Sequence, residues 1–200
     1  MSKQVITRIA INSGPRNRQT VFFRGILVAP VMIFLSAFGT QSSWDSLMRI
    51  SSGLMVYPVL LALLFRGKYP SYLLAFNKAL MELSVRAFAY LFLLTDEYPS
   101  IEASQIVSVE FPDVEGGKAL NQFAPLFKWI LAIPLYIFGL FYILYSLFVT
   151  FFAWIITTAT GEYPEWAAGP VYATIAYWNR VYGYALILVT DEYPSFSLMN

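Results

Sequence analysis

Two arginines, Arg86 and Arg180, stand inside otherwise apolar helical sequence, and their type and position suggest chemistry. A guanidinium among apolar side chains is costly, so it marks a functional site or a paired structural contact. Glu82 lies one helical turn before Arg86 and is a candidate partner, as is a carboxylate from the other half. Ala176 occupies the matching position before Arg180, so we expect its partner to come from elsewhere. The candidates are Asp96, Glu97, Asp191 and a lipid phosphate.

Two acidic pairs, Asp96-Glu97 and Asp191-Glu192, follow the helical segments that carry these arginines. An acid near a helix C-terminus opposes the helix dipole by about 0.3–1 kcal/mol. We therefore expect these carboxylates to accept hydrogen bonds from a partner arginine or from N–H groups of a following turn. The plainer alternative is a solvated stop with a Tyr-Pro anchor at the membrane–water boundary. Neighbouring side chains diverge on most backbones, which disfavours a paired acid–base mechanism.

The residue types that are missing narrow the possible chemistry further. The chain contains no Cys and no His, which removes thiolate nucleophiles, disulfides, haem ligands and the commonest zinc ligands. Glu115-Gly116-Gly117-Lys118 lacks the longer frame of a phosphate-binding loop. We expect no catalytic residue, no metal and no cofactor. A pigment, quinone or lipid-tail groove formed by the rings at 166, 172, 177, 178, 182 and 184 is the alternative.

The first half places these residues on a strand, two apolar segments and a helix. Residues 4–11 alternate like a short strand. The apolar segments Gly25–Gly39 and Leu54–Phe65 follow, with a polar interlude between them. Fifteen residues of helix cover only about 22 Å of a hydrocarbon layer about 30 Å thick. The two segments therefore form either a hairpin that dips into the bilayer or spans extended by their flanks. A helix is expected over Ser71–Leu94.

The second half has the same plan. Ile106–Phe111 alternates like a strand, and Trp129–Thr157 is an uncharged apolar stretch that fits one tilted span or a tight hairpin. A helix is expected over Glu165–Thr190. The two strands can pair with each other, which would join the halves on one side of the membrane.

Repeated motifs indicate an internal duplication. Thr95–Ser100 returns unchanged as Thr190–Ser195, and Arg86 and Arg180 each follow a Tyr-Pro pair by sixteen residues. We interpret residues 1–100 and 101–200 as two repeats. The Tyr-Pro pairs are predicted structural, partner or lipid contacts, together with the arginines and acids above. They are Tyr69, Pro70, Tyr98, Pro99, Tyr163, Pro164, Tyr193 and Pro194.

These motifs resemble those of a bacterial membrane-protein family, domain-of-unknown-function family 4389. The resemblance lies in Gly-x-Tyr-Pro, a helix with an arginine, and Leu-x-Thr-Asp-x-Tyr-Pro-Ser-Phe. Residues 106–196 match best, and the first half matches with an insertion and with Ile101 in place of Phe. The resemblance implies two tandem copies in a membrane protein. It carries no assigned activity and therefore no catalytic residues.

Composition predicts where the protein resides. The chain is 58% hydrophobic and 12% charged, against about 25% charged residues in soluble domains. We expect an all-α integral membrane protein with a short strand leading into each half. It would have about four to six hydrophobic helices, including re-entrant or interfacial ones. Five basic residues precede the first acid, which favours the bacterial inner membrane with a cytoplasmic N-terminus, while an organellar transit peptide is the alternative.

The sequence favours a non-catalytic multi-pass membrane protein, an accessory, assembly or lipid-organising subunit of a larger complex. Its expected partners are membrane lipids and either other membrane-protein subunits or further copies of itself, with no nucleic acid. The alternative is a small transporter or channel built from repeats, with a site near Arg86 and Arg180. Whether the repeats are parallel or inverted depends on whether the helix between them crosses the membrane.

Overall fold

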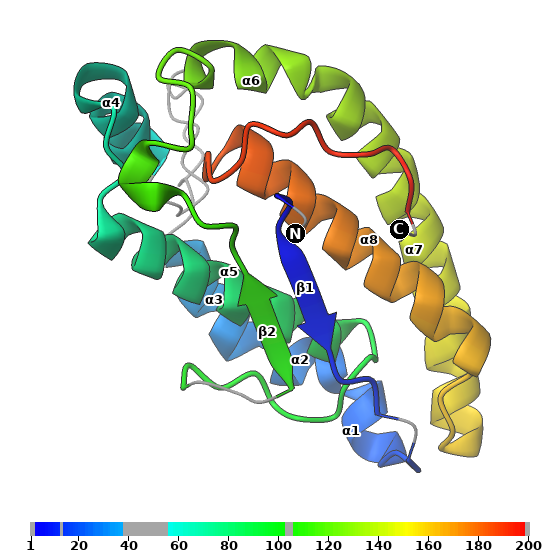
Figure 1. Cartoon of the computed structure of the whole chain (residues 1–200). Helices are drawn as coiled ribbons and strands as arrows, with labels where there is room; N and C mark the ends of the chain where they lie inside the picture. Colours follow the sequence, from blue (N-terminus) through cyan, green and yellow to red (C-terminus); the bar gives the residue numbers. More distant parts are fainter. Residues whose placement is uncertain (1–2, 13, 38–55, 103–105, 199–200) are drawn as a thin grey trace, which may run out of the picture.

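The computed structural model describes residues 3–12, 14–37, 56–102 and 106–198. These residues form eight α-helices, a short 3-10 turn and one two-stranded sheet (Figure 1). The first half contains β1 (Ile6–Ile9), α1 (Arg18–Phe22), α2 (Arg24–Leu27), α3 (Ala29–Ala37), α4 (Val56–Arg66) and α5 (Ser71–Leu91). The second half contains β2 (Val107–Glu110), η1 (Glu115–Gly117), α6 (Pro125–Leu131), α7 (Ile133–Thr160) and α8 (Glu165–Ala185).

The number of helices exceeds the expected four to six because prolines divide the apolar runs. Pro30 lies at the start of α3, and Pro134 at the start of α7. A proline disfavours helical geometry in the residue before it and supplies no N–H of its own. The apolar run that begins near Arg24 is therefore split into α2 and α3, and the run that begins near Lys128 into α6 and α7.

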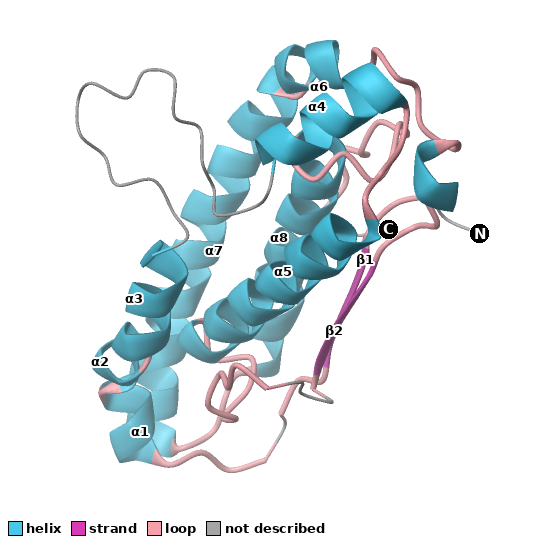
Figure 2. Ribbon diagram, turned by 90° about the vertical axis from the view of Figure 1, so that its left-hand side faces the viewer, coloured by secondary structure: helices cyan, strands magenta, loops and turns pink. Residues whose placement is uncertain are grey.

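The elements form three layers (Figure 2). The strands lie on one side, α5 and α8 form the middle layer, and α1–α3 with α7 lie on the opposite side. β2 packs on α5 and β1 on α8, so each strand contacts the long helix of the other half. Tyr69, just before α5, donates its hydroxyl to the carbonyl of Ile187, just after α8, at 2.8 Å. The start of one middle helix therefore meets the end of the other, and the two are antiparallel.

The predicted pairing of the two strands is confirmed. β1 and β2 are antiparallel, with Thr7 opposite Val109 and Arg8 opposite Ser108. Thr7 and Val109 are buried against the middle helices, whereas Arg8 and Glu110 are exposed and paired with each other. The alternation follows from the strand pleat, which sends successive side chains to opposite faces. One face of the sheet is therefore packed and the other is polar and open.

Matching contacts also cross between the halves at the two ends of the molecule. Arg18 donates from Nε to the carbonyl of Thr158 at 2.7 Å, near the end of α7. Gln122 donates from Nε2 to the carbonyl of Leu64 at 2.6 Å, near the end of α4. The N-terminal segment of each half thus binds the last apolar helix of the other. Such matched contacts are what a duplicated unit would produce, and the division into two repeats stays a prediction.

The apolar segments of the two halves differ in form. α7 is one continuous helix, so the tight-hairpin alternative for the second half is wrong. α3 packs on α5 and α4 packs on α6 at one end of the molecule, so the two do not lie side by side as a hairpin (Figures 1 and 2). The polar interlude between them lies outside the described residues.

Within the described residues, α7 alone is long and apolar enough to cross a membrane, with a mean hydropathy of 2.0. Its 28 residues extend about 42 Å at 1.5 Å per residue. It ends at Gly161, whose φ of 82° is the left-handed conformation that glycine adopts without strain. α4 has eleven residues and falls well short of the roughly 20 that a span needs. The expected multi-pass arrangement therefore stays a prediction.

Replacing Gly139 with alanine should lower the stability of the protein. A Cβ at this position of α7 would lie 2.6 Å from the Trp178 ring of α8, so the two helices would have to separate. We expect a loss of about 1–3 kcal/mol in the free energy of unfolding, measured by denaturant unfolding in detergent. Gly169→Ala is the matched control, because its Cβ would meet nothing within 4 Å and alanine favours the helix. Equal effects of the two substitutions would contradict this packing.

Candidate functional site

Asp96 binds two buried arginines just beyond the end of α5. Arg16 donates from Nη1 to Asp96 Oδ1 at 3.2 Å, and Arg24 pairs with the same carboxylate oxygen. Arg24 also donates from Nη1 to the carbonyl oxygens of Tyr90 and Thr95 at 3.0 and 3.1 Å. The arginine side chains are 0% and 2% exposed. We name Arg16, Arg24 and Asp96 the Asp96 cluster.

A corresponding arrangement follows α8. Lys128 pairs with Asp191 at 2.5 Å and donates to the carbonyl of Thr190 at 2.8 Å. The backbone N–H of Asn121 donates to the other Asp191 oxygen at 2.6 Å. Lys128 lies over the Tyr184 ring at 5.3 Å, as Arg24 lies over the Tyr90 ring at 4.5 Å. We name Lys128 and Asp191 the Asp191 cluster.

Asp96 and Asp191 follow two turns of the same type, one after each long helix. Leu93 and Leu188 have φ values of 68° and 63°, which is uncommon and strained for a residue with a Cβ. Both leucine side chains are fully buried, and this burial holds the turn in place. Thr95 and Thr190 then accept, on Oγ1, the N–H groups of Glu97 and Glu192, each at 3.1 Å. Each turn aims its aspartate at the cation of its own half.

The two arginines singled out from the sequence lie outside these clusters. Arg86 donates to the carbonyl oxygens of Glu102 and Glu82, and Arg180 donates to that of Ser197 at 2.8 Å. Both residues are 7% exposed. The expected acidic or phosphate partners are thus replaced by backbone carbonyls, because the chain folds back after each helix and its carbonyl groups reach the guanidinium. Glu82 instead accepts the N–H of Val109, at 3.3 Å.

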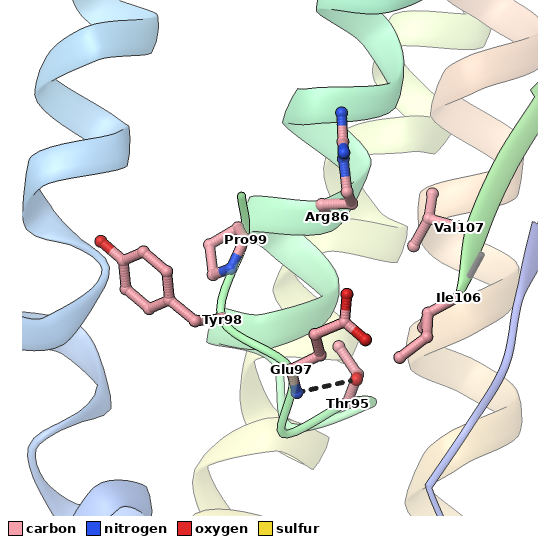
Figure 3. Close-up of a pocket in the computed structure, with 7 residues that line it drawn as sticks. All are labelled: Arg86, Thr95, Glu97, Tyr98, Pro99, Ile106 and Val107. Atoms are coloured by element: carbon pink, nitrogen blue, oxygen red, sulfur yellow. Dashed lines mark hydrogen bonds between the residues drawn. The ribbon is translucent and has the colours of Figure 1, made fainter. Parts of the chain in front are cut away.

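The cavity beside Arg86 is too small for a substrate (Figure 3). Its volume is about 10 Å³, room for about one water molecule. Figure 3 shows Arg86 and Glu97 on its wall with Tyr98 and Pro99, and the dashed bond joins Glu97 to Thr95. Arg86 therefore has a structural role, because its hydrogen bond to Glu102 joins α5 to the segment that follows it.

The tyrosines of the four Tyr-Pro pairs differ in their exposure. Tyr69 is 4% exposed, and Tyr163 lies under Arg16, whose guanidinium is 4.7 Å from the ring centre. Tyr69 is therefore an internal packing residue, whereas Tyr163 is half-buried. Tyr98 and Tyr193 are exposed and pack edge-on against Tyr90 and Tyr184. For Tyr98 and Tyr193 the role of boundary anchor stays a prediction.

The prolines of these motifs have a local role. Pro70 and Pro164 are the N-caps of α5 and α8. Pro99 lines the small cavity beside Arg86. Pro194 follows Tyr193 in the segment after α8.

Burial sets the electrostatics of the clusters. It lowers the pKa of the Arg16 guanidinium, and the adjacent Asp96 carboxylate opposes this shift. Burial likewise lowers the pKa of the Lys128 ammonium group, against the opposing effect of Asp191. It raises the pKa of Tyr163 to about 12. Arginine remains charged in such surroundings, whereas lysine can give up its proton. The clusters hold charge in place and supply no nucleophile.

A larger cleft of about 680 Å³ opens beside the start of α8. Ile11, Ile156 and Ala168 provide its apolar part, and Glu162 and Glu165 provide carboxylates, with Tyr163 and Pro164 between them. The described residues contain no group of acids that could hold a metal ion. The cleft is of a size that admits a lipid chain or another small molecule.

Sequence reasoning missed Arg16, Arg24 and Lys128 as site residues. A signal for two of them was present, because Arg24 and Lys128 each stand six residues before a proline in the repeated apolar run. The partner carboxylates lie far along the chain, so no local spacing connects them with these cations. Among the described residues, Arg16 has no counterpart in the second half, since Asp191 pairs with one cation there and Asp96 pairs with two.

No protein family, curated protein or solved structure matches this chain in our comparisons. The resemblance noted from the sequence motifs therefore stays a prediction.

Asp96→Asn should destabilise the protein more than Asp191→Asn. The first change leaves two buried arginines without an anion, and removing one partner of a buried ion pair costs about 3–5 kcal/mol. The second leaves a lysine, which can become neutral and limit the loss. Unfolding in detergent at pH 7 measures both, with the exposed Glu162→Gln as control. A larger loss for Asp191→Asn would contradict the two-to-one charge arrangement.

The Asp191→Asn variant should also become more stable, relative to the wild type, as the pH rises toward 10. Without Asp191, the lowering of the Lys128 pKa by burial is no longer opposed by a carboxylate. The folded variant therefore releases the Lys128 proton at a lower pH than the wild type does. The unfolded chain keeps the proton up to the ordinary pKa of 10.5. The unfolded state then binds more protons, and stability increases with pH. The Asp96→Asn variant should show no such gain, because arginine does not deprotonate in this range.

Proposed function

We propose that this protein is a non-catalytic membrane subunit that is embedded through α7 and its neighbours and assembles with other membrane proteins. The observation that carries the proposal is the outer face of α7. It is covered with large apolar side chains that are 37–63% exposed. They include Ile137, Phe138, Leu140, Phe141, Leu144, Leu147, Phe148, Phe151, Phe152, Ile155 and Ile156. A soluble monomer rarely leaves so large a contiguous apolar surface open.

Lipid is the solvent that fits this surface. The helix has no charged residue along its 28 positions, and only 22% of its most apolar window is buried inside the molecule. Its length exceeds the roughly 30 Å of the hydrocarbon layer, which allows for tilt. The two ion clusters support this seating, because the Asp96 cluster lies near the C-terminal end of α7 and the Asp191 cluster near its N-terminal end. Arg16 donates its backbone N–H to the carbonyl of Gly161, directly after the last residue of α7. Lys128 lies in α6, five residues before α7 begins at Ile133.

The chemistry of the described residues supports a role without catalysis. The ion pairs of the Asp96 and Asp191 clusters lie at helix ends, and neither cluster contains a group that can attack a substrate or exchange protons near neutral pH. The transporter alternative needed Arg86 and Arg180 to share a water-accessible cavity. They lie near the C-terminal ends of two antiparallel helices, and each binds a carbonyl of the segment that follows its own helix. This geometry gives the alternative no support.

An arginine on the outer face of α7 should weaken membrane insertion. Phe148→Arg places a cation at a 63% exposed position, where the expected cost in the middle of a span is about 2.5–3.5 kcal/mol. Ile101→Arg is the matched control, because Ile101 is 64% exposed but lies in the segment after α5. The fraction retained in membranes after alkaline extraction reports insertion. Equal retention of the two variants would show that lipid does not contact α7.

Purification tests the subunit role. Solubilised from its native membrane in mild detergent, the protein should bring with it stoichiometric protein partners or bound lipid. A homogeneous monomer that carries neither would contradict the proposed function.

A further inference from the structure

We infer that the open face of the two-stranded sheet is the contact surface for a second copy of this chain within the membrane. The inference rests on the proposed function, because it requires α7 to be in lipid.

The sheet lies level with the interior of α7 and not with its ends. Tyr172 and Asn179, near the middle of α8, donate to the carbonyl and the hydroxyl of Thr7, each at 2.8 Å. α8 in turn packs along α7, where Thr174 donates to the carbonyl of Tyr142 at 3.5 Å, and Figures 1 and 2 show the strands level with the middle part of α7. With α7 across the bilayer, the strands are therefore at the depth of the hydrocarbon.

The open face of the sheet is unsuited to lipid at that depth. Its outward side chains are Ile6, Arg8, Ser108 and Glu110. The Arg8 and Glu110 side chains pair with each other but remain 62% and 46% exposed. Charged groups and open strands are disfavoured in hydrocarbon, where no water satisfies them. Another protein surface must cover this face.

The distribution of charge selects a second copy as that surface. In a twofold dimer the same patch of both copies forms the interface. If residue i of one copy contacts residue j of the other, then residue j of the first copy also contacts residue i of the second. The face carries one cation and one anion, and a twofold rotation can set Arg8 of each copy opposite Glu110 of the other. Edge-to-edge strand pairing is hindered, because the outer carbonyl of Thr7 and the outer N–H of Val109 are bound by Tyr172 and Glu82. Packing face to face remains.

Cysteine cross-linking tests the contact directly, since the chain has no native cysteine. Ser108→Cys introduces a thiol opposite Arg8 on the open face. Mild oxidation of membranes should convert most of this variant into a disulfide-linked dimer. Ser100→Cys, an exposed position outside both strands, should remain mostly monomeric under the same conditions.

Charge reversal tests the proposed complementarity. Arg8→Glu or Glu110→Arg alone would bring like charges together across the twofold axis, and each should lower the dimer affinity at least about tenfold. The two single variants expressed together should form a mixed dimer, because one copy then carries two anions on this face and the other two cations, whereas the pair within each copy stays unrestored. Mass measured in detergent, with membrane retention recorded for every variant, provides the readout.

The outcomes separate this inference from the proposed function. A wild-type chain that is not retained in membranes would overturn the proposed function. A second outcome is that the protein is retained in membranes, but the Ser108→Cys thiol stays free and reacts with a membrane-impermeant maleimide. This outcome would overturn the inference alone, because the sheet then faces water. Cross-linking of Ser108→Cys to a different protein would also overturn it, because the covering surface is then not a second copy.

Discussion

Buried positive charge is the constraint on which the rest of this fold depends. Arg24 and Lys128 are withdrawn from water at the beginning of the apolar helices, and each needs an anion that its own segment does not supply. The fold provides one by bringing the chain back after α5 and after α8, where a turn through a left-handed leucine directs an aspartate inward. The ion pair thereby fixes where the long helix ends and how the following segment returns.

Several elements could be predicted because their signals are local. The alternation at 4–11 and 106–111 predicts the strands, and Pro70 and Pro164 mark the first turns of α5 and α8. The helix ends were harder to predict. The two long helices were expected to end at Leu94 and Thr190. They end earlier, at Leu91 and Ala185. The intervening apolar residues form the buried turn, and their hydrophobicity does not distinguish a turn from a helix.

The site was predicted less completely because its partners are distant in sequence. Arg24 and Asp96 are separated by 72 positions, and only the folded chain brings them together. Similar motifs also have different surroundings. Tyr69 is buried against the other half and Tyr98 is exposed, although each precedes a proline in a comparable motif. A tyrosine-proline pair specifies the local backbone, while the neighbouring helices decide whether the ring meets protein or the surroundings.

The strand pairing between halves has a consequence for synthesis. β1 is complete after Ile9, but its partner begins at Val107, so about half of the chain must be made before the first hydrogen bond of the sheet can form. Contacts this far apart in sequence are slow to establish, because a long loop must close first. The nascent first half therefore emerges from the ribosome with its leading strand unpaired, and only translation of the second half completes it.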